Sequence, residues 1–425
     1  MRTKRVRLPV TSGSSRAIDP IRKIKLVYVT TVPLTLVFFF HGLIGYLKRR
    51  GFEICVISSP GDHAEQFRAE ESIDFYPVPM VRAISPVADI LAIWRLWRLF
   101  RKIKPDIVHS HTPKAGLLGT IAARASGVPV VFLSVFGLRQ MTQTGFSRRL
   151  LDITTWLSCS LADRVWCDSF SVREYMVKTN LSSDRKTVVL GQGSANGVDA
   201  EGAFSPQRYG LPVRSNVRKR YGIPNDAYVL GFAGRIVKDK GMHELACAWR
   251  SLRDRYANLH LLLVGPIESE DPLLPDDDAM FRSGSRIHLT GYQKDVAPYL
   301  AAMDLFVMPS YREGFGLTNV EASAMQLPVI STSIPGCIDS VEDGVTGTLV
   351  PPRSADALIA AIERYLNDLE LGREHGIAGR QRVLRDFRQE PIWEALSKEY
   401  MRVLAGKGLK VSIPEEALVS QSQYD

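Results

Sequence analysis

Short apolar segments alternate with helical stretches along most of the chain, and no other sequence feature restricts the fold as strongly. In the first half, the apolar segments lie at residues 25–29, 52–59, 106–111, 128–135, 164–169 and 186–193. A second series lies at residues 228–235, 259–266, 286–292, 304–310, 327–333 and 346–352. Short apolar strands separated by helices are typical of parallel sheets with helices on both faces. The sequence therefore predicts an α/β protein with two Rossmann-like domains that face a cleft.

An irregular, proline-containing stretch from Asn196 to about Pro224 separates the two series and predicts a hinge near residues 195–220. The chain has 425 residues, which is too long for one ordinary core. We expect a basic tail at residues 1–20, a first domain at 21–200 and a second domain at 201–390. The remaining segment, 391–425, would begin with a helix from about Pro391 to Leu404 that crosses back to the first domain and would end in a tail.

The composition, with 45% apolar and 23% charged residues, is that of a soluble globular protein. The five cysteines are scattered and form no Cys-x-x-Cys pair, so a disulfide framework or a zinc site is not expected and a reducing cytosol fits. The net charge is +9, but residues 1–25 hold eight basic side chains and one acid. A basic tail indicates an anionic surface as a partner, whereas a nearly neutral body gives no indication of a nucleic-acid groove.

Residues Leu26–Leu47 contain no charged side chain, and their length alone would permit a membrane span. We interpret them instead as a strand, a break at Thr30–Pro33 and a helix from Leu36 to Arg50, because this βαβ pattern explains the break and a span does not. A membrane span is the alternative. A secretory signal is disfavoured because no cleavage site follows the segment.

Ligands of open α/β sheets bind at the carboxyl ends of the strands, so residues that directly follow strands are the candidate site residues. After the strand at 228–235, Arg235 and Lys240 precede a helix, where two cations and free backbone N–H groups together favour a diphosphate. The alternative is a solvated basic turn.

The stretch YREGFGLTNVEAS, Tyr311–Ser323, follows another strand. Gly314 and Gly316 would let backbone N–H groups approach an anion closely. Glu313 lies in this loop, and sugar hydroxyls are its expected partners because a carboxylate accepts two hydroxyl hydrogen bonds. Glu321 has an alternative role, since Thr318 and Glu321 have the spacing of a helix capping box.

These residues carry a resemblance. The stretch EGFGLTNVEASAMQLPVISTSIPG, together with Arg235, Lys240 and DGVTGTLVPP, resembles the C-terminal half of the retaining glycosyltransferases of family four, which have the GT-B fold. The first half agrees, since KPDIVHSHTPKAGLLGTIAARASGVPVV and GSANGVD resemble bacterial members that extend lipid-linked or surface glycans. The resemblance covers roughly residues 24–400.

The resemblance implies a role for each matching position. Glu313 and His111 would be the catalytic residues that face the donor sugar, and Glu321 would bind the ribose. The donor diphosphate and distal sugar would be held by Arg235, Lys240 and the backbone of Gly314, Phe315, Gly316 and Leu317. Gly291 and Tyr292 would read the base. From the residues alone, His111 could equally be a satisfied histidine at a strand end.

One loop departs from the family pattern. Many members have a Gly-Gly loop after the first strand, where this chain has Thr30–Thr35. The acceptor-side candidates are Thr31, Lys114 and Asn196. Neither a metal nor another cofactor is expected, because no Asp-x-Asp follows an apolar strand and Asp276–Asp278 is predicted to lie in a solvated loop. Cations and helix N-termini would stabilise the leaving nucleoside diphosphate instead.

Ser85 and Pro86 predict the start of a helix, with serine as its cap. Arg95, Arg98 and Lys102 would share one face of it, with Trp94 and Trp97 toward one border. Such a helix suits an interface with anionic lipid, or equally a helix that packs on the sheet with a basic outer face.

The resemblance implies that this enzyme transfers a sugar with retained configuration in bacterial surface polysaccharide or glycan assembly. The donor would be a nucleotide sugar, a UDP-linked hexose or N-acetylhexosamine, and the acceptor a soluble or lipid-linked glycan, the latter on a polyprenyl diphosphate. The enzyme would be cytoplasmic and peripheral on the inner face of the cell membrane. The alternatives are a UDP-sugar epimerase of similar fold and a non-catalytic relative that binds nucleotide sugars.

Overall fold

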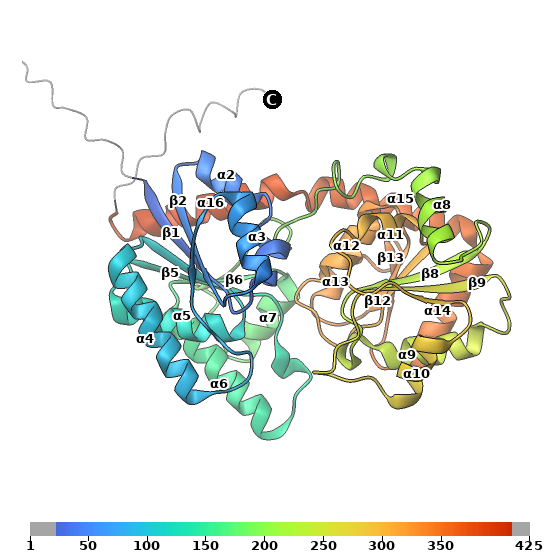
Figure 1. The fold of residues 1–425 in the computed structure, drawn as a ribbon, viewed down its shortest axis with the longest axis horizontal. Helices are drawn as coiled ribbons and strands as arrows, with labels where there is room; N and C mark the ends of the chain where they lie inside the picture. The colour runs from blue at the N-terminus through green and yellow to red at the C-terminus, as the bar shows by residue number, and fades with distance from the viewer. Residues whose placement is uncertain (1–22, 410–425) are drawn as a thin grey trace, which may run out of the picture.

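A computed structural model describes residues 23–409 and contains two parallel sheets, one in each half of the chain (Figure 1). The first sheet has the strand order β3-β2-β1-β4-β5-β6-β7, and the second has the order β10-β9-β8-β11-β12-β13. The strands of the first sheet are β1 (Ile24–Val29), β2 (Phe52–Ser58), β3 (Asp74–Pro77), β4 (Ile107–Ser110), β5 (Val130–Val135), β6 (Arg164–Cys167) and β7 (Thr187–Val189). Those of the second are β8 (Tyr228–Ala233), β9 (Leu259–Val264), β10 (Ile287–Leu289), β11 (Leu305–Met308), β12 (Val329–Thr332) and β13 (Gly347–Val350). The predicted fold class is confirmed.

Helices cover the sheets because the central strands are apolar on both faces, as in β5 and β9, where every residue is buried. The first half contains α1 (Leu34–Phe40), α2 (Leu43–Arg49), α3 (Asp62–Glu71), α4 (Pro86–Ile103), α5 (Pro113–Ser126), α6 (Gly145–Leu161) and α7 (Phe170–Lys178). The second half contains α8 (Leu211–Arg220), α9 (Met242–Leu252), α10 (Pro275–Ser283), α11 (Ala297–Ala301), α12 (Leu317–Ala324), α13 (Cys337–Ser340), α14 (Ala355–Asn367) and α15 (Leu369–Asp386). Short 3₁₀ turns lie at Arg139–Met141, Pro206–Arg208 and Lys238–Lys240.

The last helix, α16 (Gln389–Gly406), packs on the first half of the chain (Figure 1). Its Ile392, Leu396 and Leu404 belong to the buried cluster that contains β1 and β2 side chains. The hydroxyl of Tyr400 lies 3.0 Å from that of Tyr28 and 2.5 Å from His109 Nδ1, deep in that cluster. Because these polar groups are buried, each needs the others, which fixes the position of the helix.

The prediction of one continuous helix over Leu36–Arg50 is wrong in one respect, because the structure has two helices there, α1 and α2. Gly42 between them has φ of +79°, and a Cβ there would come within 2.6 Å of the Trp393 ring on α16. The close approach of a helix from the other end of the chain therefore sets the break. None of the helices within residues 23–409 is both long and apolar enough to span a membrane.

Four other local predictions need correction. The sequence reading missed β3, and it missed α8, which occupies part of the stretch expected to be irregular. The helix α4 begins at Pro86 as predicted, but the Ser85 side chain makes no capping hydrogen bond. Asp276–Asp278 forms the first turn of α10, and Asp277 is buried between His243 and Arg250 rather than solvated. The predicted basic tail at residues 1–20 and the stretch 410–425 lie outside the described residues.

Candidate donor site at the domain interface

The candidate residues follow the central strands of both sheets, at the points where the strand order reverses. In the second sheet, β8 and β11 are neighbours, and the loops after them carry Lys240 and Glu313. In the first sheet, β1 and β4 are neighbours, and the loops after them carry Thr31 and His111. Loops that leave such neighbouring strands in opposite directions open the crevice in which ligands of α/β sheets bind.

Lys240 and Glu313 meet directly. The Lys240 ammonium lies 2.5 Å from the Glu313 carboxylate, and both side chains are largely buried. The adjacent Gly241 makes this approach possible, since its φ is +69° and a Cβ there would lie 1.9 Å from the Pro309 carbonyl oxygen. The two loops are therefore packed against each other through a position that only glycine can fill.

The loop that holds Glu313 is anchored on both sides. The Tyr311 hydroxyl donates to Glu244 over 2.5 Å, and Arg312 forms an ion pair with Asp239 over 3.0 Å. On the other side, the Phe315 ring is buried against Phe387. The Phe315 side chain is thus committed to the core, and only its backbone remains available for the predicted contact with a donor.

Glu321 does not complete a capping box. The helix α12 begins at Leu317 with Gly316 as its N-cap residue, and no side chain caps it by a hydrogen bond. Gly316 has φ of +75°. Thr318 is already the second residue of the helix, so it does not occupy the N-cap position. Burial raises the pKa of the Glu321 carboxyl to about 8. The capping alternative is therefore wrong, and the predicted role in ribose binding stays a prediction.

Arg235 and Lys240, the two predicted diphosphate-binding cations, are each paired with a different carboxylate. The Arg235 guanidinium is half-exposed and lies 2.9 Å from the Glu268 carboxylate. Gly291 already uses its carbonyl oxygen, which accepts hydrogen bonds from the Gly265 N–H and the Thr290 hydroxyl. Both predicted base-binding residues are exposed, and the Tyr292 side chain is 45% exposed.

His111 is buried at the end of β4, and its ring lies 4.8 Å from the Phe40 ring and 4.1 Å from the His109 ring, centre to centre. Burial lowers the pKa of the imidazole to about 3, so the ring is neutral. Neither ring nitrogen has a hydrogen-bond partner within residues 23–409. The alternative of a satisfied strand-end histidine is thus wrong.

The three acceptor-side candidates are all engaged in internal contacts. The Thr31 hydroxyl lies 2.7 Å from that of Thr112 and accepts the Ala115 N–H, which ties the β1 loop to α5. Lys114 forms an ion pair with Asp89 of α4 at 2.7 Å. Asn196 bonds the Trp393 indole N–H and the His41 carbonyl, so it links the hinge, α16 and the break between α1 and α2. Lys114 and Asn196 hold the fold together in this arrangement.

The sequence reading missed a set of contacts between the domains. The Ser169 hydroxyl donates to the Gly314 carbonyl oxygen over 2.7 Å, and the Phe170 N–H donates to Asp339 over 2.9 Å. Asp168 is buried beside Gly314, and a Cβ added at Gly314 would lie 2.5 Å from the Asp168 Oδ2 atom. Burial, with the nearby Asp339 and Glu313, raises the pKa of this carboxyl well above its usual value. The strand-end rule that located Glu313 also points to Asp168, which directly follows β6.

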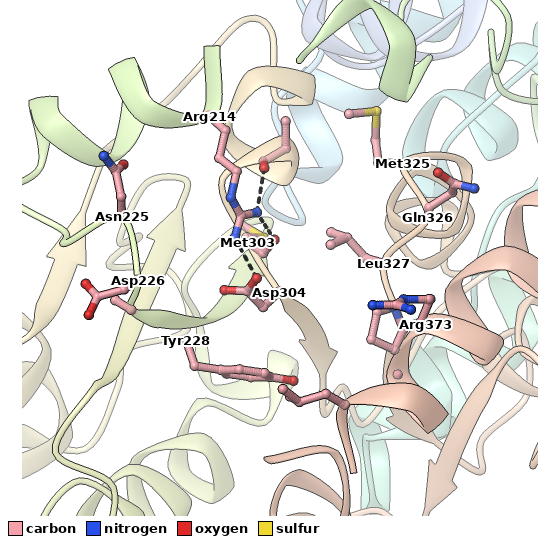
Figure 2. Close-up of a pocket in the computed structure, with 15 residues that line it drawn as sticks. Arg214, Asn225, Asp226, Tyr228, Met303, Asp304, Met325, Gln326, Leu327 and Arg373 are labelled. Carbon is pink, nitrogen blue, oxygen red and sulfur yellow. Dashed lines mark hydrogen bonds and ion pairs between the residues drawn. The ribbon is translucent and has the colours of Figure 1, made fainter. Parts of the chain in front are cut away.

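A pocket of about 540 Å³ lies elsewhere, at the amino ends of β8, β11 and β12 (Figure 2). Arg214, Tyr228 and Asp304 contribute to its lining. Arg214 donates to the Ala301 and Met303 carbonyls and pairs with Asp304 at 2.6 Å, as Figure 2 shows. The charges of Arg214 and Asp304 thus balance each other. The pocket lies at the opposite end of the second sheet from Lys240 and Glu313.

Comparisons with known proteins agree with this arrangement. Residues 37–193 match the family model described as a glycosyl transferase 4-like domain, and residues 227–368 match the one described as glycosyl transferases group 1. The chain is 33% identical over 376 residues to the capsular polysaccharide biosynthesis glycosyltransferase CapM of Staphylococcus aureus, covering 88% of this chain and 96% of that protein. The chain belongs to the family-four glycosyltransferases.

Two further likenesses concern one related sequence and one solved structure. It is 28% identical to an Escherichia coli UDP-Gal:alpha-D-GlcNAc-diphosphoundecaprenol alpha-1,3-galactosyltransferase, over 76% of this chain and 82% of that protein. Its structure resembles that of Anabaena Alr3699/HepE in complex with UDP and glucose, with a TM-score of 0.71, 18% identity and coverage of 89% of this chain and 99% of that one. The latter likeness supports the GT-B fold. The epimerase alternative is not favoured, because both family models and the CapM relative are described as glycosyltransferases.

Proposed function

We propose that this glycosyltransferase moves a hexose or N-acetylhexosamine from a UDP-linked donor to a glycan on a polyprenyl diphosphate, with retained anomeric configuration. The product would serve bacterial surface polysaccharide assembly. The name of the galactosyltransferase relative supports the acceptor class, that of the CapM relative supports a role in polysaccharide assembly, and the UDP complex of HepE supports the donor class.

The contact between Lys240 and Glu313 is the observation that carries this proposal. A UDP-linked donor has a doubly charged diphosphate between the nucleoside and a sugar that carries hydroxyl groups. When it binds, Lys240 turns to the diphosphate and Glu313 accepts hydrogen bonds from the sugar, so that each charged group exchanges one partner for another. The exchange avoids leaving either charge buried and unpaired, which would be costly.

His111 fits the sugar rather than the diphosphate. Its ring is neutral because burial holds the pKa near 3, so it adds no positive charge to a phosphate site. A buried polar atom without a partner costs about 1–3 kcal/mol. Sugar hydroxyls can donate to one ring nitrogen and accept from the other, and they would thereby remove this cost.

The domain contacts around Gly314 support transfer over hydrolysis. Ser169 and Asp339 draw the end of β6 and the start of α7 against the loop that follows β11. Closure of this kind excludes water from the reacting sugar, which protects the donor until an acceptor hydroxyl is in place. Breaking of the bond between the sugar and the diphosphate would leave charge on the diphosphate, and we expect Lys240, Arg235 and the N-terminus of α12 to stabilise that charge.

The expected setting is peripheral on the inner membrane face, because a polyprenyl-linked acceptor resides in the bilayer. Metal independence is also part of the proposal. Within residues 23–409, no three His, Cys, Asp or Glu side chains gather in a way that could hold an ion.

The decisive experiment combines the purified chain with a panel of UDP- and GDP-linked sugars in a thermal-shift assay, followed by transfer to a synthetic polyprenyl-diphosphate glycan. We expect one UDP-sugar to raise the melting temperature most and to be transferred, with an α-linked product by NMR and with full activity in EDTA. A β-linked product would contradict retention. Loss of activity in EDTA, with recovery in magnesium or manganese, would contradict metal independence.

A further inference from the structure

The outer faces of α4 and α6 expose large apolar side chains. Their exposed fractions are Ile90 67%, Trp94 49%, Phe146 80%, Ile153 61% and Trp156 52%. A monomeric protein does not often keep so many large apolar groups in water on two helices of one layer. This surface, defined by those five residues and called the apolar face below, therefore needs a partner.

The apolar face is not left over from core packing. On α4, Ala92, Leu96 and Phe100 are buried against the sheet, whereas Ile90 and Trp94 point outward on the opposite side. Both helices pack against α5, which lies between them in the layer on that side of the first sheet (Figure 1). The helix α4 thus packs on the sheet, but its outer surface is aromatic and aliphatic as well as basic.

The charges around the apolar face have one sign. The helices α4 and α6 contain one acid each, Asp89 and Asp152. Asp89 is paired with Lys114, and Asp152 lies 3.8 Å from Arg148. Exposed bases on the two helices are Arg95, Arg98, Arg101, Lys102, Arg148 and Arg149. The Arg98 guanidinium lies 4.8 Å from the centre of the Trp94 ring, so base and aromatic ring form one unit.

The apolar face begins beside the candidate site. Because α4 and α6 each start at the carboxyl ends of strands, their first turns lie on the side of the domain interface. Ile84, just before α4, is 72% exposed, and Phe146 is the second residue of α6. Nearby, Arg82 lies 3.3 Å from Glu270 of the second domain. A partner that binds to the apolar face would therefore lie close to the domain interface and to the candidate site.

We propose that the apolar face is a docking surface for an anionic lipid bilayer, with the aromatic rings inserted at the headgroup level and the arginines against lipid phosphates. This inference rests on the proposed function, because it explains how an acceptor anchored in a bilayer reaches Glu313. A second copy of the chain is a poorer occupant. Self-pairing of the same face would bring its arginines against one another, which is unfavourable.

The test uses co-sedimentation of the full chain with vesicles of equal parts phosphatidylglycerol and phosphatidylcholine. The test variant changes Trp94, Phe146 and Trp156 to Ser, and a matched control changes the exposed Leu211, Val345 and Ile377 of the second domain to Ser. We expect the test variant to bind at least about tenfold more weakly than the native chain and the control to bind normally. Arg98→Glu with Arg149→Glu should weaken binding in low salt and have less effect in high salt.

Equal binding by the native chain and the test variant would overturn the proposal, as would equal binding to vesicles of pure phosphatidylcholine. A dimer seen in sedimentation velocity that the test variant dissociates would assign the face to a second copy instead. The Glu313→Gln variant separates this inference from the proposed function. This variant should bind vesicles as the native chain does. If the native chain binds vesicles but transfers no sugar, the proposed function is contradicted while the docking surface is not.

Discussion

The strand ends of the two domains meet at one interface but carry different chemistry. In the second domain, Lys240 and Arg235 are each paired with a carboxylate, Glu313 and Glu268. In the first domain, His111 is neutral and surrounded by aromatic rings. The second domain thus provides charge that must be balanced at all times, while the first provides an uncharged wall. This division suits a ligand in which an anionic diphosphate is joined to a sugar that carries uncharged hydroxyl groups.

The largest effect should come from the loop of the second domain. Replacing Glu313 with Gln keeps its size but removes the charge that faces Lys240. We expect turnover to fall about 10²–10³-fold, in the range seen when one group that stabilises a transition state is lost, while UDP affinity changes little. Steady-state kinetics and calorimetry measure the two effects. Full activity in this variant would show that the Glu313 carboxylate takes no part in catalysis.

The next effect concerns the paired cation. Lys240→Ala should weaken UDP binding by about 1.5–3 kcal/mol, or roughly 10- to 150-fold, because a charge-assisted contact is lost. Lys238 lies on the same 3₁₀ turn with an exposed side chain and serves as the matched control. Its alanine variant should bind UDP normally in isothermal calorimetry. If both variants bind alike, the diphosphate is held elsewhere.

A smaller effect is expected in the first domain. His111→Phe fills the same aromatic surroundings and removes two buried nitrogens that lack partners within residues 23–409. We expect stability in urea to be equal or higher and transfer to fall about tenfold, the loss of roughly one hydrogen bond. Since the pKa of His111 is near 3, the shape of the rate profile between about pH 5 and 8 should not change.

His109 provides the contrast to His111. His109→Phe should destabilise the fold, because the bonds to Tyr400 and Ser134 are lost. If His111→Phe instead destabilises the fold and leaves transfer intact, the first domain contributes packing and not chemistry.

The last effect concerns the stability of the fold and not turnover or affinity, and it is a pH dependence at Glu321. Its folded pKa of about 8 lies above the ordinary value of 4.5 because the carboxyl is buried. The folded state therefore favours the protonated form, and this contribution is complete below pH 4.5 and is lost as pH rises toward 8. Glu321→Gln should remove this loss, with a slope difference of up to about 1.4 kcal/mol per pH unit. Urea titrations at several pH values measure it, and parallel curves for both proteins would contradict burial as the cause.

Much of the fold follows from the sequence because strands buried on both faces are continuously apolar and end at recognisable loops. That pattern located the strands that carry Lys240, Glu313 and His111 before any contact was known. The strand-end rule also covers Asp168, which lies near the end of the apolar segment at 164–169 and directly follows β6, although only the fold brings that carboxyl against the second domain. The family resemblance supplied the roles that spacing alone left open.

Tertiary structure decided what depends on partners distant in the chain. The break at Gly42 is set by Trp393, the pairing of Arg235 by Glu268, and the shielding of Asp168 by the Gly314 loop. The amphipathic pattern of α4 was readable, but whether its tryptophans are covered depended on which elements the fold places above them. Local propensity and periodicity act over a few residues and are written in the sequence, whereas burial and charge pairing depend on distances that exist only after the two domains have assembled.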